Sequence, residues 1–251
     1  MSLYGLPPAE LGPTRDHLLA VEAAFARAGQ PSLMCDNLVT LSRIHSFVHD
    51  QAFIAALHAA ARSEADYDKV WKIHTYCWAA RSALALDGDF VECGVFEGLY
   101  SAAMTRYLDW GNAPKTLYLY DTFAGLDPAY SSPSERDINQ YYARRPDWHD
   151  QVVARFAGYA NVRVIKGVVP TALESAPARI AFLHLDMNAA AAETAALDRL
   201  FRRIVPGGFV LMDDYGRFEQ RELHAALKAW MTEAGYGVLE LPTGQGLVVK
   251  R

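Results

Sequence analysis

The chain has 251 residues, and 51% of them are hydrophobic, which is enough to bury a full core. Its formal net charge is −5 with scattered lysine and arginine, which argues against a nucleic-acid partner because phosphate binding requires a basic stripe. No apolar run approaches the ~20 residues of a membrane span, and the N-terminus lacks the layout of a signal peptide. We therefore expect a soluble α/β protein with no membrane partner.

The three cysteines, Cys35, Cys77 and Cys93, lie far apart and form no C-x-x-C motif. This pattern predicts neither a disulfide framework nor a zinc site. A reducing, cytoplasmic location is the natural expectation.

Residues 1–88 are expected to form a helical N-terminal extension without strands. Apolar residues recur at near-helical spacing in three stretches, at about 18–25, 37–53 and 70–84. The third stretch carries a dense polar-aromatic group, interpreted as core residues with polar tips rather than as a ligand wall. Its members are Trp71, His74, Tyr76 and Trp78.

From Phe90 onward the pattern alternates between strand and helix, which predicts a parallel sheet covered on both faces. Strands are expected at 89–93, 116–120, 162–166, 180–185, 208–212, 236–241 and 246–250. Helices are expected near 98–110, 148–158, 170–175, 191–204 and 217–234. Because only residues 242–245 join the last two strands, they must be antiparallel. The predicted fold over 89–251 is therefore a Rossmann-like, doubly wound sheet with a C-terminal antiparallel hairpin, as in class I methyltransferases.

The segment 126–150 is long for a connection in an α/β domain and holds several prolines and aromatic residues. Long loops at strand carboxyl ends often cover a binding site. We favour a lid over a floppy insertion.

The first strand of the sheet runs into a glycine turn and then a helix, with the spacing E-x-G-x-x-x-G at Glu92, Gly94 and Gly98. Glycine lets the backbone pass close under a ligand, and a helix start presents free N–H groups. A second acid, Asp121, follows the next strand, where it can take ribose hydroxyls. This ordered pair predicts S-adenosylmethionine, rather than the dinucleotide of a G-x-G-x-x-G motif. Further candidate cofactor contacts are Cys93, Ser101, Thr122, Gly167 and Asp186, with Ser101 either holding the cofactor carboxylate or capping the helix.

Two later strands also end in polar residues, at Asp186 to Asn188 and at Asp213-Asp214. These strands are expected to be neighbours, so the side chains would form an oxygen cluster of the kind that Mg²⁺ or Ca²⁺ prefers. A metal there would lower the pKa of an acceptor hydroxyl. The alternative is a pair of helix caps, which is the better explanation for Asp214 alone, whereas the four residues together favour a metal site. His184 lies within a strand and is interpreted as a core histidine.

Four blocks in order resemble the macrocin O-methyltransferase family: V-E-C-G-V-F-E-G at 91–98, L-Y-D-T-F-A-G-L at 119–126, F-L-H-L-D at 182–186 and V-P-G-G-F-V-L-M-D-D-Y at 205–215. The resemblance covers about residue 37 to the C-terminus. It implies an S-adenosylmethionine donor, a class I fold, a Mg²⁺ site, and an N-terminal part used in homo-oligomerisation and active-site closure. It also implies methyl transfer to a small-molecule hydroxyl, often of a deoxysugar. Carried over by position, Glu92, Gly94 and Gly98 match the donor loop, Asp121 the ribose acid, and Asp186, Asp213 and Asp214 the metal acids.

The sequence departs from this family at Asn188, where antibiotic-pathway members usually carry an aspartate proposed as metal ligand and base. Asparagine offers an oxygen ligand but cannot accept a proton at neutral pH. Either Asp186, His149 or Asp214 then serves as the base, or the protein works without the usual metal assistance. The rival hypotheses are a methyltransferase-fold binding protein without catalysis and, more remotely, a nicotinamide-dependent oxidoreductase.

Overall fold

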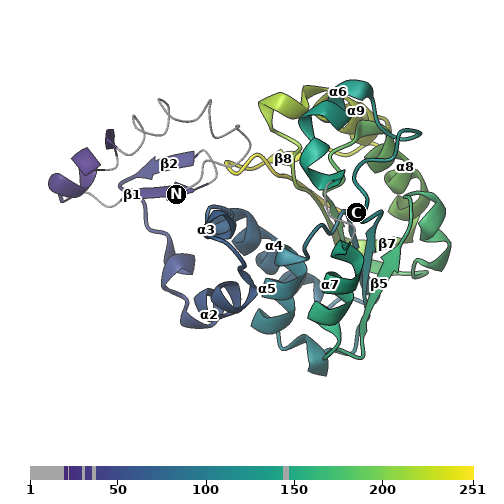
Figure 1. Ribbon diagram of the computed structural model, residues 1–251, viewed down its shortest axis with the longest axis horizontal. Helices are drawn as coiled ribbons and strands as arrows, with labels where there is room; N and C mark the ends of the chain where they lie inside the picture. Colours follow the sequence, from purple (N-terminus) through teal and green to yellow (C-terminus); the bar gives the residue numbers. More distant parts are fainter. Residues whose placement is uncertain (1–19, 22, 30–31, 36–37, 144–146) are drawn as a thin grey trace. The chain divides into compact units, whose positions relative to one another are not determined.

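The computed structural model describes residues 20–21, 23–29, 32–35, 38–143 and 147–251 (Figure 1). The chain divides into two compact units, residues 1–75 and 76–251, and the boundary falls inside helix α4 (Val70–Ala83). Within the described ranges, no helix has both the length and the apolar composition that crossing a membrane demands.

The first unit contains a β-hairpin that the sequence patterns do not predict. Strands β1 (Ser32–Cys35) and β2 (Leu38–Leu41) pair antiparallel, with Ser32 opposite Leu41 and Cys35 opposite Leu38. The expectation of a strand-free extension is therefore wrong. Each strand has only four residues, too few for a period of two to be distinguished from helical spacing.

The expected helix over 37–53 is also wrong, because residues 38–41 form a strand and the α-helix begins only at residue 51. Asp50 accepts a hydrogen bond from the Phe53 N–H (3.1 Å) and caps α2 (Gln51–Ala60). Two short helices flank it, η1 (Ser46–His49) and α3 (Glu64–Tyr67). The first apolar stretch is helical at residues 20–21 and 23–27, and its start at 18–19 lies outside the described residues. The third corresponds to α4.

Aromatic packing stabilises the first unit. The rings of Phe47 and His74 stack at a centroid distance of 4.4 Å, and Phe53 meets His74 edge-on at 5.8 Å. Trp71 lies 5.6 Å from Phe47. Because burial opposes charging, it lowers the pKa of His74, although Asp50 partly offsets this effect.

The second unit is built on a seven-stranded sheet in the order β5-β4-β3-β6-β7-β9-β8. The bounds are β3 (Asp89–Cys93), β4 (Leu117–Asp121), β5 (Val162–Lys166), β6 (Ile180–Leu185), β7 (Ile204–Met212), β8 (Leu239–Glu240) and β9 (Gly246–Val249). The first five pair in parallel, and β9 pairs antiparallel with both β7 and β8. This confirms the predicted doubly wound sheet with its final hairpin. The strand order reverses between β3 and β6, which is where open α/β sheets bind ligands.

Side chains alternate between the two faces of this sheet, as a period of two requires. One face joins a single apolar cluster that includes Val91, Leu183 and Val210. It is covered by η4 (Thr171–Ser175), α8 (Ala190–Leu200) and α9 (Arg221–Glu233), and the last two helices pack against each other. On the other face, Phe90 and Phe182 pack edge to face at 5.5 Å.

Short helices complete the connections, with α5 (Leu99–Tyr107) after β3 and α7 (Trp148–Phe156) before β5, away from α8 and α9 (Figure 1). The remaining helical turns are η2 (Trp110–Asn112), η5 (Phe201–Arg203) and η6 (Phe218–Gln220).

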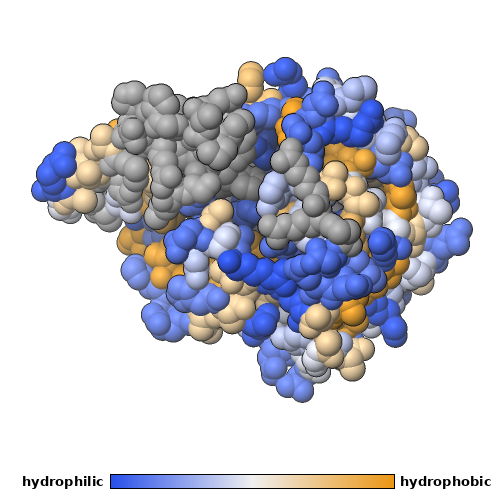
Figure 2. Space-filling model, in the orientation of Figure 1, coloured by the Kyte–Doolittle hydropathy of each residue, from blue (hydrophilic) through white to orange (hydrophobic). Residues whose placement is uncertain are grey.

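The segment 126–150 contains its own helix, α6 (Pro133–Ile138), followed by η3 (Gln140–Ala143). Residues 144–146 lie outside the described part of the chain. Polar side chains cover much of the molecular face in Figure 2, with apolar ones interspersed.

Candidate active site

The bend between β3 and α5 has the conformation that its two glycines were predicted to allow. Gly94 has a φ of +89°, and a Cβ there would stand 2.0 Å from the Asp186 carbonyl oxygen. Gly98 has a φ of +73° and forms the N-cap of α5. Glycine at position 94 therefore brings the bend directly against the backbone that follows β6.

Asp121, at the end of β4, holds this bend. Its Oδ2 accepts hydrogen bonds from the N–H groups of Val95 (2.6 Å) and Phe96 (2.8 Å), and its Oδ1 accepts one from Phe123 (2.7 Å). Phe96 and Phe123 both have φ near +50°, an uncommon conformation for large side chains. The bend and Asp121 are thus in contact, and the carboxylate fixes the shape of the bend.

Glu92 lies beneath the bend in a buried polar network. Its Oε2 accepts hydrogen bonds from the Tyr76 hydroxyl (3.2 Å) and from the Ser101 hydroxyl. Both Glu92 and Ser101 are almost fully buried. Glu92 and Ser101, both predicted to contact the donor, are hydrogen-bonded to each other in the structure, and this bond joins the end of β3 to α5 across the bend.

The remaining predicted donor contacts also have local structural partners. The Thr122 hydroxyl donates to the Gly125 carbonyl (2.6 Å) and accepts from the Ala124 N–H (3.2 Å), which shapes the turn after β4. A Cβ at Gly167 would stand 2.9 Å from the Ala172 Cβ, so glycine there permits η4 to pack. Cys93 is buried, and burial raises the pKa of its thiol.

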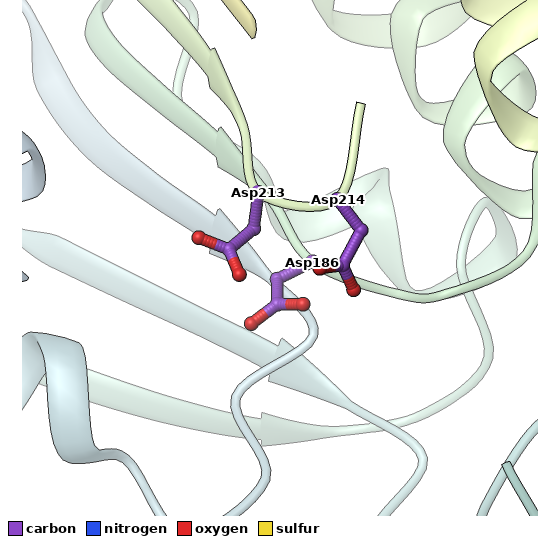
Figure 3. Close-up of side chains that lie close together, drawn as sticks. All are labelled: Asp186, Asp213 and Asp214. Carbon is purple, nitrogen blue, oxygen red and sulfur yellow. The ribbon is translucent and has the colours of Figure 1, made fainter. Parts of the chain in front are cut away.

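Three predicted metal ligands come together at the neighbouring strand ends. Asp186 follows β6, and Asp213 and Asp214 follow β7, whose pairing places Leu185 opposite Met212. One ligand oxygen from each of the three carboxylates lies within 4.8 Å of the others. The three side chains gather in one place (Figure 3). A set of carboxylate oxygens at this spacing suits a hard divalent cation.

Neighbouring side chains orient two of these acids. The Gln245 amide donates to Asp213 Oδ1 (2.8 Å) and in turn accepts from the Thr243 hydroxyl (2.9 Å). The Tyr100 hydroxyl donates to the other oxygen of Asp213 at 3.3 Å. Arg217 lies 3.7 Å from Asp214 Oδ1. Such outer partners fix the direction of ligand side chains.

Asn188 faces the acids with its nitrogen rather than its oxygen. Its side-chain amide donates to Asp186 Oδ1 (3.4 Å), while its oxygen accepts from the Gln220 amide (3.0 Å). Its φ is +56°, a left-handed conformation that asparagine tolerates better than most residues. In this arrangement Asn188 orients Asp186.

His184 connects the network beneath the bend to the three acids. Its Nδ1 lies 3.3 Å from Glu92 Oε1, and its Nε2 lies 3.8 Å from Asp213 Oδ1. Burial lowers the pKa of His184, but the two carboxylates outweigh this and raise the pKa to about 10. His184 is thus a buried core residue that lies between two acids.

His149, the third base candidate, lies at the start of α7. Its Nδ1 is 3.3 Å from Asp150 Oδ1, and its ring lies 5.2 Å from that of Phe123. It is not a member of the group formed by Asp186, Asp213 and Asp214.

The sequence patterns do not single out several residues that shape this site. Glu135 belongs to the capping-box motif S-P-S-E at 132–135, a signal that could have marked it. Gln220 and Gln245 carry no local signal, because their importance depends on contacts with residues 32 positions away.

Residues 74–234 match the model of the macrocin O-methyltransferase (TylF) family. The chain belongs to the macrocin O-methyltransferase family. This membership confirms the resemblance carried by the four sequence blocks.

Two curated proteins are similar to part of this chain. The chain is 31% identical over 150 residues to 8-demethyl-8-(2,3-dimethoxy-alpha-L-rhamnosyl)-tetracenomycin-C 4'-O-methyltransferase of Streptomyces olivaceus, covering 56% of this chain and 58% of that protein. It is 27% identical over 142 residues to mycinamicin III 3''-O-methyltransferase of Micromonospora griseorubida, covering 51% and 55%. The matches therefore span just over half the length of each relative.

Solved structures of methyltransferases have the same fold as this macrocin O-methyltransferase family member. The O-methyltransferase NovP superposes with a TM-score of 0.59 at 18% identity, covering 72% of this chain and 80% of NovP. The calicheamicin methyltransferase CalS11 gives a TM-score of 0.59 at 14% identity, covering 82% and 94%. These similarities confirm the class I methyltransferase fold.

Proposed function

We propose that the protein is an S-adenosylmethionine-dependent O-methyltransferase that methylates a hydroxyl on the sugar moiety of a small-molecule natural product. Family membership supports the reaction type. The names of the two relatives describe methyl transfer to glycosylated natural products, which supports a sugar hydroxyl as the acceptor.

The observation that carries this proposal is the contact between Gly94 and Asp186. It places the donor bend and the group of three acids at the same edge of the sheet, on the adjacent strands β3 and β6. A methyl donor held at the bend would therefore lie beside an acceptor held at the acids. Methyl transfer requires this proximity, because the sulfonium is already electrophilic and the protein mainly has to align the two groups.

For the donor, the bend offers backbone N–H groups at the start of α5, and Asp121 lies next to it. We assign Gly94 and Gly98 to close backbone approach, Asp121 to the ribose, and the network of Glu92, Ser101 and Tyr76 to support of the bend from beneath.

The acids fit a divalent cation such as Mg²⁺, because all three ligand groups are carboxylates and outer partners orient them. Asp186, Asp213 and Asp214 would hold the ion, with Asn188 holding Asp186 in place. When bound, the ion would polarise the acceptor hydroxyl and lower its pKa. Asp186 and Asp214 belong to this group, so either carboxylate would be in position to accept the proton of the acceptor hydroxyl. His149 lies outside the group.

The segment 126–150 is proposed as the lid over the acceptor. We also propose a homo-oligomeric assembly and a reducing, cytoplasmic compartment. All three cysteines, Cys35, Cys77 and Cys93, are buried free thiols, which supports a reducing environment.

The test is the release of S-adenosylhomocysteine from S-adenosylmethionine in the presence of Mg²⁺ and a panel of rhamnosylated and other deoxysugar-bearing natural products. Product that depends on one acceptor supports the proposal. Donor binding by calorimetry without turnover on any acceptor would instead favour a binding protein that has lost catalysis. Fluorescence titration with NADH tests the oxidoreductase alternative, and tight NADH binding without S-adenosylmethionine binding would refute the methyltransferase.

A further inference from the structure

Helix α8 begins at a residue that cannot cap it. Its N-cap is Ala189, whose side chain offers no hydrogen-bond acceptor. The first N–H groups of a helix need an acceptor from elsewhere in such a case. The Ala190 N–H donates to Glu135 Oε1 at 2.8 Å, and Glu135 lies 55 residues earlier in the chain.

Glu135 is a buried residue of α6, within the segment 126–150. Its other carboxylate oxygen, Oε2, accepts from the Ser132 N–H at 2.7 Å, while the Ser132 hydroxyl accepts from the Glu135 N–H at 3.2 Å. One carboxylate therefore caps its own helix and the start of α8 at the same time. A negative charge at a helix N-terminus is stabilising, and hydrogen bonds to a charged acceptor are stronger than neutral ones.

The loop between β6 and α8 is held at both ends by buried glutamates. At its beginning, the Met187 N–H donates to Glu193 Oε1 at 3.0 Å. At its end, Ala190 donates to Glu135. Between these anchors lies Asn188, in its left-handed conformation and bonded to Asp186. Through its hydrogen bond to Ala190, Glu135 thus connects α6 to the loop that directly follows Asp186.

We propose that Glu135 is a positioning residue that fixes the loop following Asp186 and thereby couples α6 to the group of three acids. The coupling itself is structural, and only its effect on catalysis rests on the proposed function. An acceptor that contacts α6 acts on Asp186 through this carboxylate, and a cation held by the acids acts on α6 by the same route.

The first test is hydrogen exchange of the full-length protein, which needs neither donor nor acceptor. Glu135→Ala is expected to speed exchange of the Ala190 amide by about tenfold, because it loses a hydrogen bond to a charged acceptor. Exchange within α6 also speeds up. Ser132→Ala is the matched control: it removes the reciprocal cap of α6 and leaves the bond to Ala190, so it should affect α6 alone. Equal protection of Ala190 in the wild type and in Glu135→Ala would overturn the proposal, as would loss of that protection in Ser132→Ala.

The second test separates positioning from a general loss of folding. Glu135→Gln keeps the size of the side chain and is compatible with a capping box, so it should fold even if Glu135→Ala does not. In Mn²⁺ titrations followed by electron paramagnetic resonance, Glu135→Gln is expected to lower the affinity for Mn²⁺ by about tenfold. A loss of this size is typical when a residue that orients a metal ligand is replaced. The affinity for S-adenosylmethionine should stay within about twofold, because the bend and Asp121 are untouched. A loss of affinity by the same factor for Mn²⁺ and for S-adenosylmethionine would contradict the positioning role. If the wild type did not bind S-adenosylmethionine, the proposed function would be refuted, but the hydrogen-exchange result would still hold.

Discussion

The amide of Gln245 and the carboxylate of Asp213 are joined by a 2.8 Å hydrogen bond, although 32 residues separate them. Gln245 lies in the turn between β8 and β9, so the final antiparallel hairpin supplies an orienting group to the acids at the end of β7. The hairpin thus has a part in the site as well as in the sheet.

Gln245→Leu should weaken divalent-ion binding by about tenfold, because it removes one of the side chains that orient Asp213. It should leave donor affinity unchanged, because it does not alter the bend. The measurement is Mn²⁺ titration together with calorimetry of S-adenosylmethionine binding. Thr243→Val, which removes the hydroxyl behind Gln245, should have the same effect in weaker form. Unchanged ion affinity in Gln245→Leu would contradict this role.

Asp121→Ala should reduce donor affinity far more than Asp213→Ala does. It removes the acceptor for three backbone N–H groups that hold the bend, and a loss of about 100-fold corresponds to about 2.7 kcal/mol, within the range for such bonds. Asp213→Ala should instead reduce turnover at saturating donor. Calorimetry of both variants with S-adenosylmethionine checks this difference, and equal losses of affinity would count against the assigned roles.

Gly94→Ala should unfold the site or destabilise the whole second unit. The added Cβ would meet the Asp186 carbonyl oxygen at 2.0 Å, and the residue has a φ of +89°, so we expect a loss of about 3 kcal/mol or more in the free energy of unfolding. Gly158→Ala is the matched control, because a Cβ there meets nothing within 4 Å. Urea denaturation of both variants provides the comparison, and similar midpoints would refute the close contact.

Protonation of His74 should destabilise the first unit below neutral pH. Burial lowers the pKa of His74 from 6.5, so between the folded and unfolded pKa values the unfolded chain binds more protons. Stability therefore rises with pH across this interval and is lost as the pH falls below about 6.5. His74→Phe, which keeps an aromatic ring against Phe47, should flatten this dependence. Urea midpoints at pH 7.5 and pH 5.5 for both proteins test the sign, and the same pH slope in both would exclude His74 as its origin.

Much of the second unit could be predicted from sequence because its strands are apolar runs bounded by glycine, proline and acids. β3, β5 and β6 have the predicted limits. The acids at strand ends were also predictable, since parallel strands bring their carboxyl ends to one edge. Their clustering within 4.8 Å agrees with that argument.

The missed features depend on contacts that no local pattern encodes. The hairpin at Ser32–Leu41 is too short for its periodicity to be visible. The hydroxyl of Tyr76, 16 residues earlier in the chain, and the ring of His184, 92 residues later, meet the buried carboxylate of Glu92, and no local pattern encodes these two contacts. The amide of Gln220 donates to the side-chain oxygen of Asn188, a contact between residues 32 positions apart. In each case a partner from another element determines where the side chain points.

The tight approach of Gly94 to the Asp186 carbonyl also limits which segments of this protein can be exchanged with a homologue. Residues 92–98 and 185–190 are best exchanged as a pair, since a residue with a Cβ at position 94 would overlap the backbone of Asp186. Recombination breakpoints placed within α5 and α8, beyond both segments, keep the two partners from the same parent.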